Sequence, residues 1–275
     1  MISTPSTSVK SRPTPLIVRF YDPSIKAEDS HGRTLNQILK WDDAHLERSH
    51  DYIQMIFPLP EGSMFSFNAP IIDEEVMLKF RSRAELRQRM SLSLNRMLQF
   101  YGFTVSTEPL EPRNTVTGFK EKTETNTFDE PDREATGEDE GKRKPNEDVT
   151  TAATAATATI SSAQASSLGY YIVRGKNWDT ASCNWTGRMD HNHLRITRIL
   201  RSLRVLGLQK ECEAFFKALQ DVYNDPRSRI GERSMMFWER AVKQPLHIAP
   251  DGERIGWLKK WEVNKTEEDV DLSRD

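Results

Sequence analysis

The sequence predicts an all-α protein, a single helical, bundle-like domain that is interrupted by a long disordered insertion. Three observations lead to this prediction. Apolar residues recur at helical spacing in several stretches that have their own start and stop signals. The composition changes abruptly between residues 104 and 169. With 275 residues, 36% of them hydrophobic, and with six Trp and twelve Phe, the chain can bury a sizeable core.

Charge and composition exclude several classes of protein. The formal net charge of −2 argues against a protein that coats nucleic acid or an anionic membrane by bulk charge. The two cysteines, Cys183 and Cys212, form no CxxC pair, which favours a reducing compartment. No apolar run approaches the roughly 18–20 residues that span a bilayer, and no signal-peptide core stands near the start. We therefore expect a soluble protein whose contact with membranes, if it has any, is peripheral.

These patterns divide the chain into five parts. We expect a disordered N-terminal tail at 1–15, a first part of the domain at 16–103, a disordered acidic and Thr/Ala-rich insertion at 104–169, a second part of the domain at 170–262 and a charged tail at 263–275. The insertion carries thirteen acidic and seven basic residues between 104 and 168. It cannot bury enough apolar surface to offset the entropy of ordering. A basic cluster within it, at 142–145, leaves a nuclear-import signal open as an alternative.

The first block begins with short elements. Residues 16–21 form an apolar run that fits either a strand or an extended arm. Thr34 fits the N-cap of a short helix that ends near Lys40. Apolar spacing then predicts one helix over residues 43–57, which Pro58 stops.

Two further helices complete the first block. Asp73 and the two glutamates after it supply the negative first turn of one helix. Ser82 and Glu85 match a capping box, so we expect the next helix to begin there. Gly102 then fits the left-handed residue that ends it.

In the second block, order is expected to resume near residues 170–173. Helical spacing and the following prolines predict helices at 191–208, at about 212–223 and at 234–245. The two tryptophans of the tail, Trp257 and Trp261, are expected to pack back on the bundle.

The helix at 191–208 is the element around which we expect the domain to be organised. Its apolar residues share one arc: Ile196, Ile199, Leu200, Leu203 and Leu206. Its arginines share the opposite arc: Arg195, Arg198, Arg201 and Arg204. Burying the apolar side chains at about 1.5–3 kcal/mol each outweighs what exposed arginines contribute. The arginines are therefore left for solvent, an acidic neighbour or an anionic partner such as nucleic acid or a phospholipid head group. Four arginines give a salt slope of only about −3.6 on double-stranded DNA, so such binding would be modest.

Enzyme signatures are missing from the sequence. It contains no GxGxxG, GxxxxGKS/T, HExxH or GxSxG motif. Cys183, His191 and His193 come nearest to a metal set, but histidines two residues apart point roughly 200° apart on a helix, and no fourth ligand is evident. We therefore expect no catalytic residues, no metal ligands and no cofactor.

Four stretches resemble the conserved domain of the opioid growth factor receptor family: residues 20–21, 50–59, 97–102 and 191–208. The resemblance covers about 16–103 and 177–261 and implies an all-helical domain. Family members are described as peptide-binding negative regulators of growth, associated with the nucleus and its outer envelope and often with membranes. This sequence departs from the family in its long insertion near 104–176 and in lacking repeats after the domain.

The sequence thus predicts a non-enzymatic, receptor-like binding protein, and the resemblance implies peptide binding and growth regulation. The candidate binding residues are Arg195, Arg198, Arg201, Arg204, His50, Tyr52 and Gln54. His50 leaves two interpretations open, because a histidine on a mainly apolar helix face is more often a core group than a site residue. The expected partner is a peptide or protein, and nucleic acid binding through the arginine arc is the alternative. The resemblance implies an intracellular, nuclear or perinuclear location.

Overall fold

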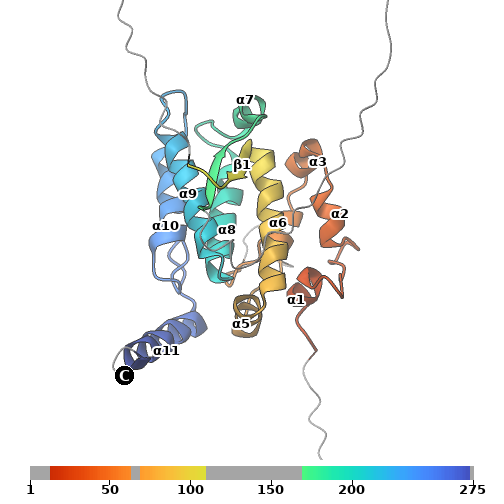
Figure 1. Ribbon diagram of the computed structural model, residues 1–275, viewed down its shortest axis with the longest axis vertical. Coiled ribbons are helices and arrows are strands. Elements are labelled where there is room, and N and C mark those ends of the chain that lie inside the picture. The colour runs from red at the N-terminus through yellow and green to blue at the C-terminus, as the bar shows by residue number, and fades with distance from the viewer. Residues whose placement is uncertain (1–12, 63–68, 110–168, 273–275) are drawn as a thin grey trace, which may run out of the picture. The chain divides into compact units, whose positions relative to one another are not determined.

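The computed structural model describes residues 13–62, 69–109 and 169–272, which form eleven α-helices, one 3-10 turn and one pair of strands (Figure 1). In chain order the elements are α1 (Leu16–Tyr21), α2 (Leu35–Leu39), α3 (Asp43–Arg48), α4 (Tyr52–Ile56), α5 (Glu74–Ser82), α6 (Ala84–Tyr101), β1 (Phe103–Ser106), β2 (Tyr171–Arg174), α7 (Trp178–Ala181), the 3-10 turn (Ser182–Asn184), α8 (His191–Val205), α9 (Gln209–Tyr223), α10 (Glu232–Lys243) and α11 (Gly256–Leu272). The predicted, mainly helical fold is confirmed. Most of the predicted insertion and N-terminal tail lies outside the described residues.

The described parts on both sides of the insertion form one unit around a shared core. Helices α8, α9 and α10 pack against one another, and α1, α2 and α5 pack against the long helix α6 (Figure 1). Aromatic residues join the two groups. The indole Nε1 of Trp185 donates to the backbone oxygen of Tyr101, at the end of α6, at 3.0 Å. The ring of Phe103 lies 6.0 Å from that of Phe215 in α9.

The strand pair is a departure from the all-α prediction. Strands β1 and β2 are antiparallel, with Phe103 opposite Arg174 and Ser106 opposite Tyr171. Their aromatic and β-branched residues favour an extended backbone, and Phe103 is buried beside the ring of Trp178, with centroids 5.1 Å apart. Strand β1 lies almost wholly in the stretch that composition assigns to the insertion, so the folded domain extends beyond residue 103.

Several helix ends follow the signals in the sequence. Thr34 and Gln37 form a complete capping box at the start of α2. Asp73 caps α5 by accepting from the backbone N–H of Val76 at 2.9 Å. Gly102 ends α6 with a φ of 88°, in the left-handed region that glycine adopts without strain.

Two predicted helix starts are wrong in detail. The N-cap of α6 is Arg83, and its side chain makes no capping bond. The hydroxyl of Ser82 donates instead to the backbone oxygen of Lys79 in the preceding helix. Helix α10 begins at Glu232, two residues before the predicted Ser234.

The apolar run at 16–21 is a helix rather than a strand or an extended arm. Within α1, Phe20 and Tyr21 are buried. The hydroxyl of Tyr21 donates to the backbone oxygen of Ile56. Tertiary packing and this bond therefore fix a helix that is too short to be stable alone.

The single helix predicted over residues 43–57 is two helices, α3 and α4, with a break at residues 49–51. Asp42 caps α3 by accepting from the backbone N–H of His45 at 2.7 Å. The apolar spacing continues through the break because both helices bury residues in the same core. Periodicity alone therefore could not show where one helix ends.

The C-terminal stretch, for which the sequence predicted no helix, forms one. Helix α11 runs to Leu272, so most of the predicted charged tail is helical. The carboxylate of Glu262 ties α11 to the preceding loop, because it accepts from the backbone N–H groups of Leu246 at 2.6 Å and His247 at 2.9 Å. Trp257 and Trp261 pack against the core, as predicted.

Candidate functional site

The arginine arc of α8 faces other parts of the protein, so the expectation that it faces solvent or an anionic partner is wrong. The acidic neighbour that the sequence also left open is found for Arg201, which pairs with Glu61. Arg195 is 5% exposed and Arg201 is 1% exposed, while Arg198 and Arg204 are half-buried. The arc faces a segment of the first block, residues 47–61, that offers backbone and carboxylate oxygens. Periodicity separates a polar arc from an apolar one, but it does not distinguish solvent from a polar protein partner.

Arg201 and Glu61 form a buried ion pair between the two blocks. Nε of Arg201 donates to Oε1 of Glu61 at 3.2 Å, and Nη2 donates to Oε2 at 3.4 Å. The side chains are only 1% and 7% exposed. One residue along α8, the hydroxyl of Ser202 donates to the backbone oxygen of Pro58 at 2.8 Å. This part of α8 is therefore fixed to the end of the 47–61 segment.

Arg195 bonds to the break between α3 and α4. Its Nη2 donates to the backbone oxygens of Glu47 at 3.2 Å and Ser49 at 2.8 Å. Its Nη1 donates to Oδ1 of Asn192 at 3.1 Å. The last carbonyls of a helix have no partner within the helix, so the guanidinium supplies the bonds that the break leaves open.

The two half-buried arginines also bond to backbone oxygens. Nη1 of Arg198 donates to Phe57 at 3.1 Å, and Nη1 of Arg204 donates to Ala241 in α10 at 3.4 Å. Burial lowers the pKa of Arg198 to about 10 and also lowers the pKa of Arg204. The four arginines thus hold α8 to its neighbours, and the anion-binding alternative loses the surface on which it depended.

The other three candidate residues lie in different surroundings. Tyr52 and Gln54 are buried, and burial raises the pKa of Tyr52 to about 12. His50 is exposed, so its interpretation as a core group is wrong. Its Nδ1 lies 3.2 Å from Nη2 of Arg195, and its ring centroid lies 5.5 Å from that of His191. Of these three residues, only His50 is accessible to a ligand.

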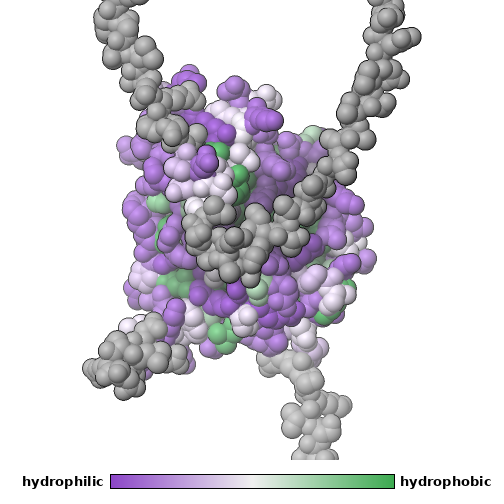
Figure 2. Space-filling model, in the orientation of Figure 1, coloured by the Kyte–Doolittle hydropathy of each residue, from purple (hydrophilic) through white to green (hydrophobic). Residues whose placement is uncertain are grey.

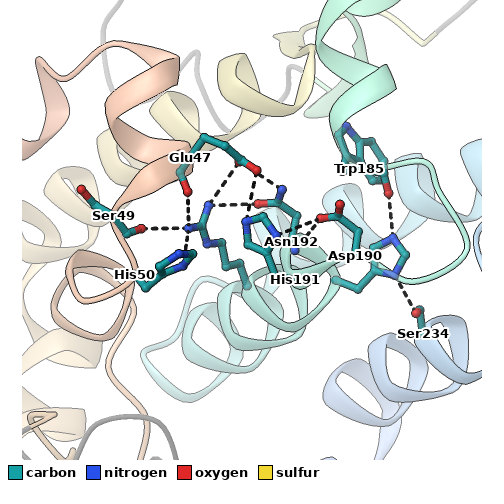
Figure 3. Close-up of polar contacts among 10 residues, drawn as sticks. Glu47, Ser49, His50, Trp185, Asp190, His191, Asn192 and Ser234 are labelled. Carbon is teal, nitrogen blue, oxygen red and sulfur yellow. Dashed lines mark hydrogen bonds and ion pairs between the residues drawn. The ribbon is translucent and has the colours of Figure 1, made fainter.

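Polar groups gather where α8 begins (Figure 3). Asp190 caps the helix by accepting from the backbone N–H of Asn192 at 2.8 Å. Glu47 approaches from α3, with one carboxylate oxygen 3.2 Å from Nε2 of His191 and the other 3.2 Å from the amide nitrogen of Asn192. Among the described residues, no group of three or more His, Cys, Asp or Glu side chains could hold a metal ion.

An open groove of about 1240 Å³ lies beside the start of α8 and the start of α10. Its apolar lining includes Met189, Leu194, Ile230 and Phe237. Met189 is 90% exposed and Leu194 is 59% exposed. Met189 and Leu194 are thus exposed to solvent, although most of the other large apolar side chains among the described residues are buried. The face of the protein in Figure 2 shows hydrophobic residues only in small, separate places.

Arginines stand around the same groove. Arg188, Arg229 and Arg233 line it and are exposed. Two acidic residues, Asp190 and Glu232, line it as well, so its formal charge is positive by one. The groove therefore combines accessible apolar surface with accessible guanidinium groups.

His193 fixes the two helices that border the groove. Its Nε2 lies 2.7 Å from the backbone oxygen of Trp185, and its Nδ1 lies 2.8 Å from the hydroxyl of Ser234 in α10. A carbonyl only accepts, so we assign the ring proton to Nε2 and let Nδ1 accept from Ser234. Burial lowers the pKa of His193, although the bond to Trp185 and the charge of Asp190 oppose that shift. The ring is thus held in its neutral form.

None of the binding residues predicted from the sequence lines this groove. One local signal was present, because Met189 precedes the N-cap of α8 and Leu194 is the fourth residue of the helix, which places two apolar residues together at the start of α8. The loop at 229–231 comes from a different part of the chain. No periodicity in the sequence places that loop beside the start of α8.

The fold and this groove define a mainly helical protein with an open groove that is both apolar and basic. Residues 11–125 match the family model described as the opioid growth factor receptor conserved region. The match overlaps the first of the two ranges, 16–103 and 177–261, over which the sequence resembles this family, and it supports that resemblance. None of the described helices is both long and apolar enough to cross a membrane.

The chain is similar to curated proteins named opioid growth factor receptor from three mammals. It is 38% identical to the protein from Mus musculus, 29% identical to that from Homo sapiens and 28% identical to that from Rattus norvegicus, each over 182 residues. The matched part is 65% of this chain but only 19%, 18% and 21% of these relatives, respectively. No solved structure matches the chain significantly.

Proposed function

We propose that this protein is a non-enzymatic, receptor-like binding module whose ligand is a peptide or a protein. The observation that carries the proposal is the groove beside α8 and α10, where Met189 and Leu194 are exposed next to arginines. Ligand sites are concave and mostly apolar, with a few polar groups that fix orientation. The name of the mammalian relatives, opioid growth factor receptor, supports a peptide ligand.

We place the ligand against the exposed part of α8 rather than against its arginine arc. Leu194 projects from the first turns of α8 into the groove, whereas the arginine arc is engaged by the 47–61 segment. His50 adjoins this surface through its ring contact with His191. A ligand longer than the groove would reach His50 in this arrangement.

Titration calorimetry with an enkephalin-type opioid peptide tests this proposal. We expect heat of binding with the full chain and its loss with Leu194→Glu, because a carboxylate would replace apolar contact surface. Leu92→Glu is a matched control, since Leu92 is also exposed, at 47%, and lies on α6 outside the groove. No binding of this peptide would show that the ligand implied by the family name does not transfer to this chain.

Growth regulation and a nuclear or perinuclear location, with peripheral membrane association, complete the proposed function. They depend on the resemblance to the opioid growth factor receptor family. Fluorescence imaging of the tagged full chain in its native cell, together with growth measurements after deletion, tests both. Uniform cytosolic fluorescence and unchanged growth would contradict these two proposals without affecting the binding proposal.

A further inference from the structure

We infer that the groove selects a peptide segment in which acidic side chains alternate with or adjoin apolar ones. This inference rests on the proposed function and names the chemistry of the ligand. Its basis is the placement of three exposed arginines around exposed apolar side chains in one open groove.

The apolar part of the ligand is indicated by the lining. Leu194 is 59% exposed and Met189 is 90% exposed, whereas most large apolar residues of the described chain are buried. Methionine adapts its shape to different partners, and Phe237 adds an aromatic face to the same lining. Covering this surface would remove apolar area from water, which favours ligands with apolar side chains.

The acidic part of the ligand is indicated by arginines without an ion-pair partner. Arg188, Arg229 and Arg233 make no ion pair with any of the described residues. Other arginines of this chain are engaged, as Arg83 is with Asp22 at 2.7 Å and Arg96 is with Asp43 at 2.7 Å. Three guanidinium groups without ion pairs around one groove therefore complement carboxylates, which accept paired N–H bonds from arginine.

Basic and apolar groups are interleaved within the groove. The guanidinium of Arg233 lies 5.9 Å from the ring centroid of Phe237. A carboxylate bound at Arg233 would thus lie beside an apolar contact. Both acidic lining residues, Asp190 and Glu232, would repel an acidic ligand. Asp190 also caps α8, so Glu232 is the one that can be changed without removing a helix cap.

Peptide fits this groove better than nucleic acid does. Three arginines engaged on double-stranded DNA would give a salt slope of only about −2.7. The net charge of the chain is −2, so the rest of the protein would not add to that attraction. The accessible methionine and leucine would contribute nothing to binding phosphates.

A random peptide library displayed on phage, selected on the full chain, tests the inference. We expect the selected peptides to be enriched in Asp and Glu next to Leu, Met or Phe. Their affinity, measured by calorimetry, should fall as the salt concentration rises, because exposed ion pairs are screened. The variant R188E/R229E/R233E should weaken binding about tenfold or more.

Two further variants provide matched controls. Arg254→Glu makes the same change at an exposed arginine beyond the other end of α10 and should leave the affinity unchanged. Glu232→Gln should tighten binding about twofold, because it removes a repelling carboxylate. Circular dichroism of the triple variant confirms the fold, and the salt dependence of the unmodified chain is informative even if that variant unfolds.

The outcomes separate the inference from the proposed function. Selected peptides without acidic enrichment, bound equally well by the triple variant and at high salt, would overturn the inference and leave peptide binding in place. Selection of no peptide at all would overturn both. Binding of a double-stranded oligonucleotide instead of peptide, lost in the triple variant, would assign the arginines to phosphate and also overturn the inference.

Discussion

The guanidinium group of Arg201 and the carboxylate of Glu61 face each other inside the protein, with Nε and Oε1 3.2 Å apart. Arg201 comes from α8 in the second block, and Glu61 comes from the end of the 47–61 segment in the first. The insertion separates these blocks in the sequence. The ion pair therefore specifies how the second block docks on the first, at the cost of removing two charges from water.

Glu61→Ala should lower the free energy of unfolding by about 3–5 kcal/mol, because it leaves the charge of Arg201 buried without its partner. Replacing both residues, as in Glu61→Leu with Arg201→Met, should restore most of that loss. Denaturant unfolding measures both. Glu239→Ala is the control, since its pair with Lys243 is 50% and 59% exposed and should contribute less than about 1 kcal/mol. An equal loss of unfolding free energy for Glu61→Ala and Glu239→Ala would show that the buried pair contributes no more than the exposed one.

If the arginines of α8 faced solvent, reversing Arg198 and Arg201 to Glu would leave the fold intact. With Arg201 buried against Glu61, Arg201→Glu places two carboxylates together in the interior. We now expect this variant to lose helical circular dichroism at physiological pH. A fully helical R201E variant would support an outward-facing arginine arc.

Arg195 and Arg198 should differ in their contributions to stability. Arg195 donates to two backbone oxygens and to Asn192, whereas Arg198 donates to one backbone oxygen and is poorly solvated. Arg195→Met should cost about 1–3 kcal/mol, because it leaves buried acceptors unpaired. Arg198→Met should cost less, because only one backbone acceptor loses its bond. Thermal unfolding of the two variants under the same conditions measures the difference, and an equal or larger loss at Arg198 would contradict it.

Most helices of this chain were predictable because the sequence signals that start, continue and end a helix are local. Apolar spacing, the N-caps Thr34 and Asp73 and the glycine Gly102 each act within one element. The break between α3 and α4 was not predictable, because its carbonyls are satisfied by Arg195, which lies more than a hundred residues away in the sequence. The strand pair also depends on partners that are distant in the sequence, as Phe103 is from Arg174, in spite of its local β propensity.

The candidate site was harder to predict for the same reason. A polar arc on α8 is consistent with solvent, with a ligand or with a polar partner inside the protein. Only the position of the 47–61 segment decides among these. The groove forms where the start of α8 meets the loop before α10, and its exposed Met189 was a weak local signal.

Gly102→Ala should destabilise the protein by about 2 kcal/mol or more. At a φ of 88°, an L-residue costs about 1–2 kcal/mol. In addition, the new Cβ would lie 3.0 Å from the Cα of Trp178 and 3.1 Å from the Cβ of Ala181. Gly187→Ala is the control, because no atom lies within 4 Å of its added Cβ, and we expect a change within about 0.5 kcal/mol. Chemical denaturation distinguishes the two, and equal stability would exclude strain at Gly102.

His193 should make the stability of the protein depend on pH. Its pKa is lowered in the folded protein, chiefly by burial, while the unfolded chain has the ordinary value of 6.5. Between these two values the unfolded state binds more protons, so the free energy of unfolding increases with pH. The contribution of neutral His193 is fully present above about pH 6.5 and is lost as the pH falls toward the folded pKa.

Denaturant unfolding of the native chain and of His193→Gln, compared between pH 7.5 and 5, tests this dependence. The amide of the substituted side chain does not titrate, so the stability of this variant should fall less on acidification than that of the native chain, even if the variant is less stable at pH 7.5. The substitution also removes the bonds to Trp185 and Ser234, which lowers the free energy of unfolding at every pH. Comparing the pH dependence of stability, rather than its absolute value, separates the titration of His193 from that constant loss. Parallel pH profiles would mean that folded His193 takes up its proton as readily as the unfolded residue does. They would contradict the neutral, buried ring that joins α8 to α10.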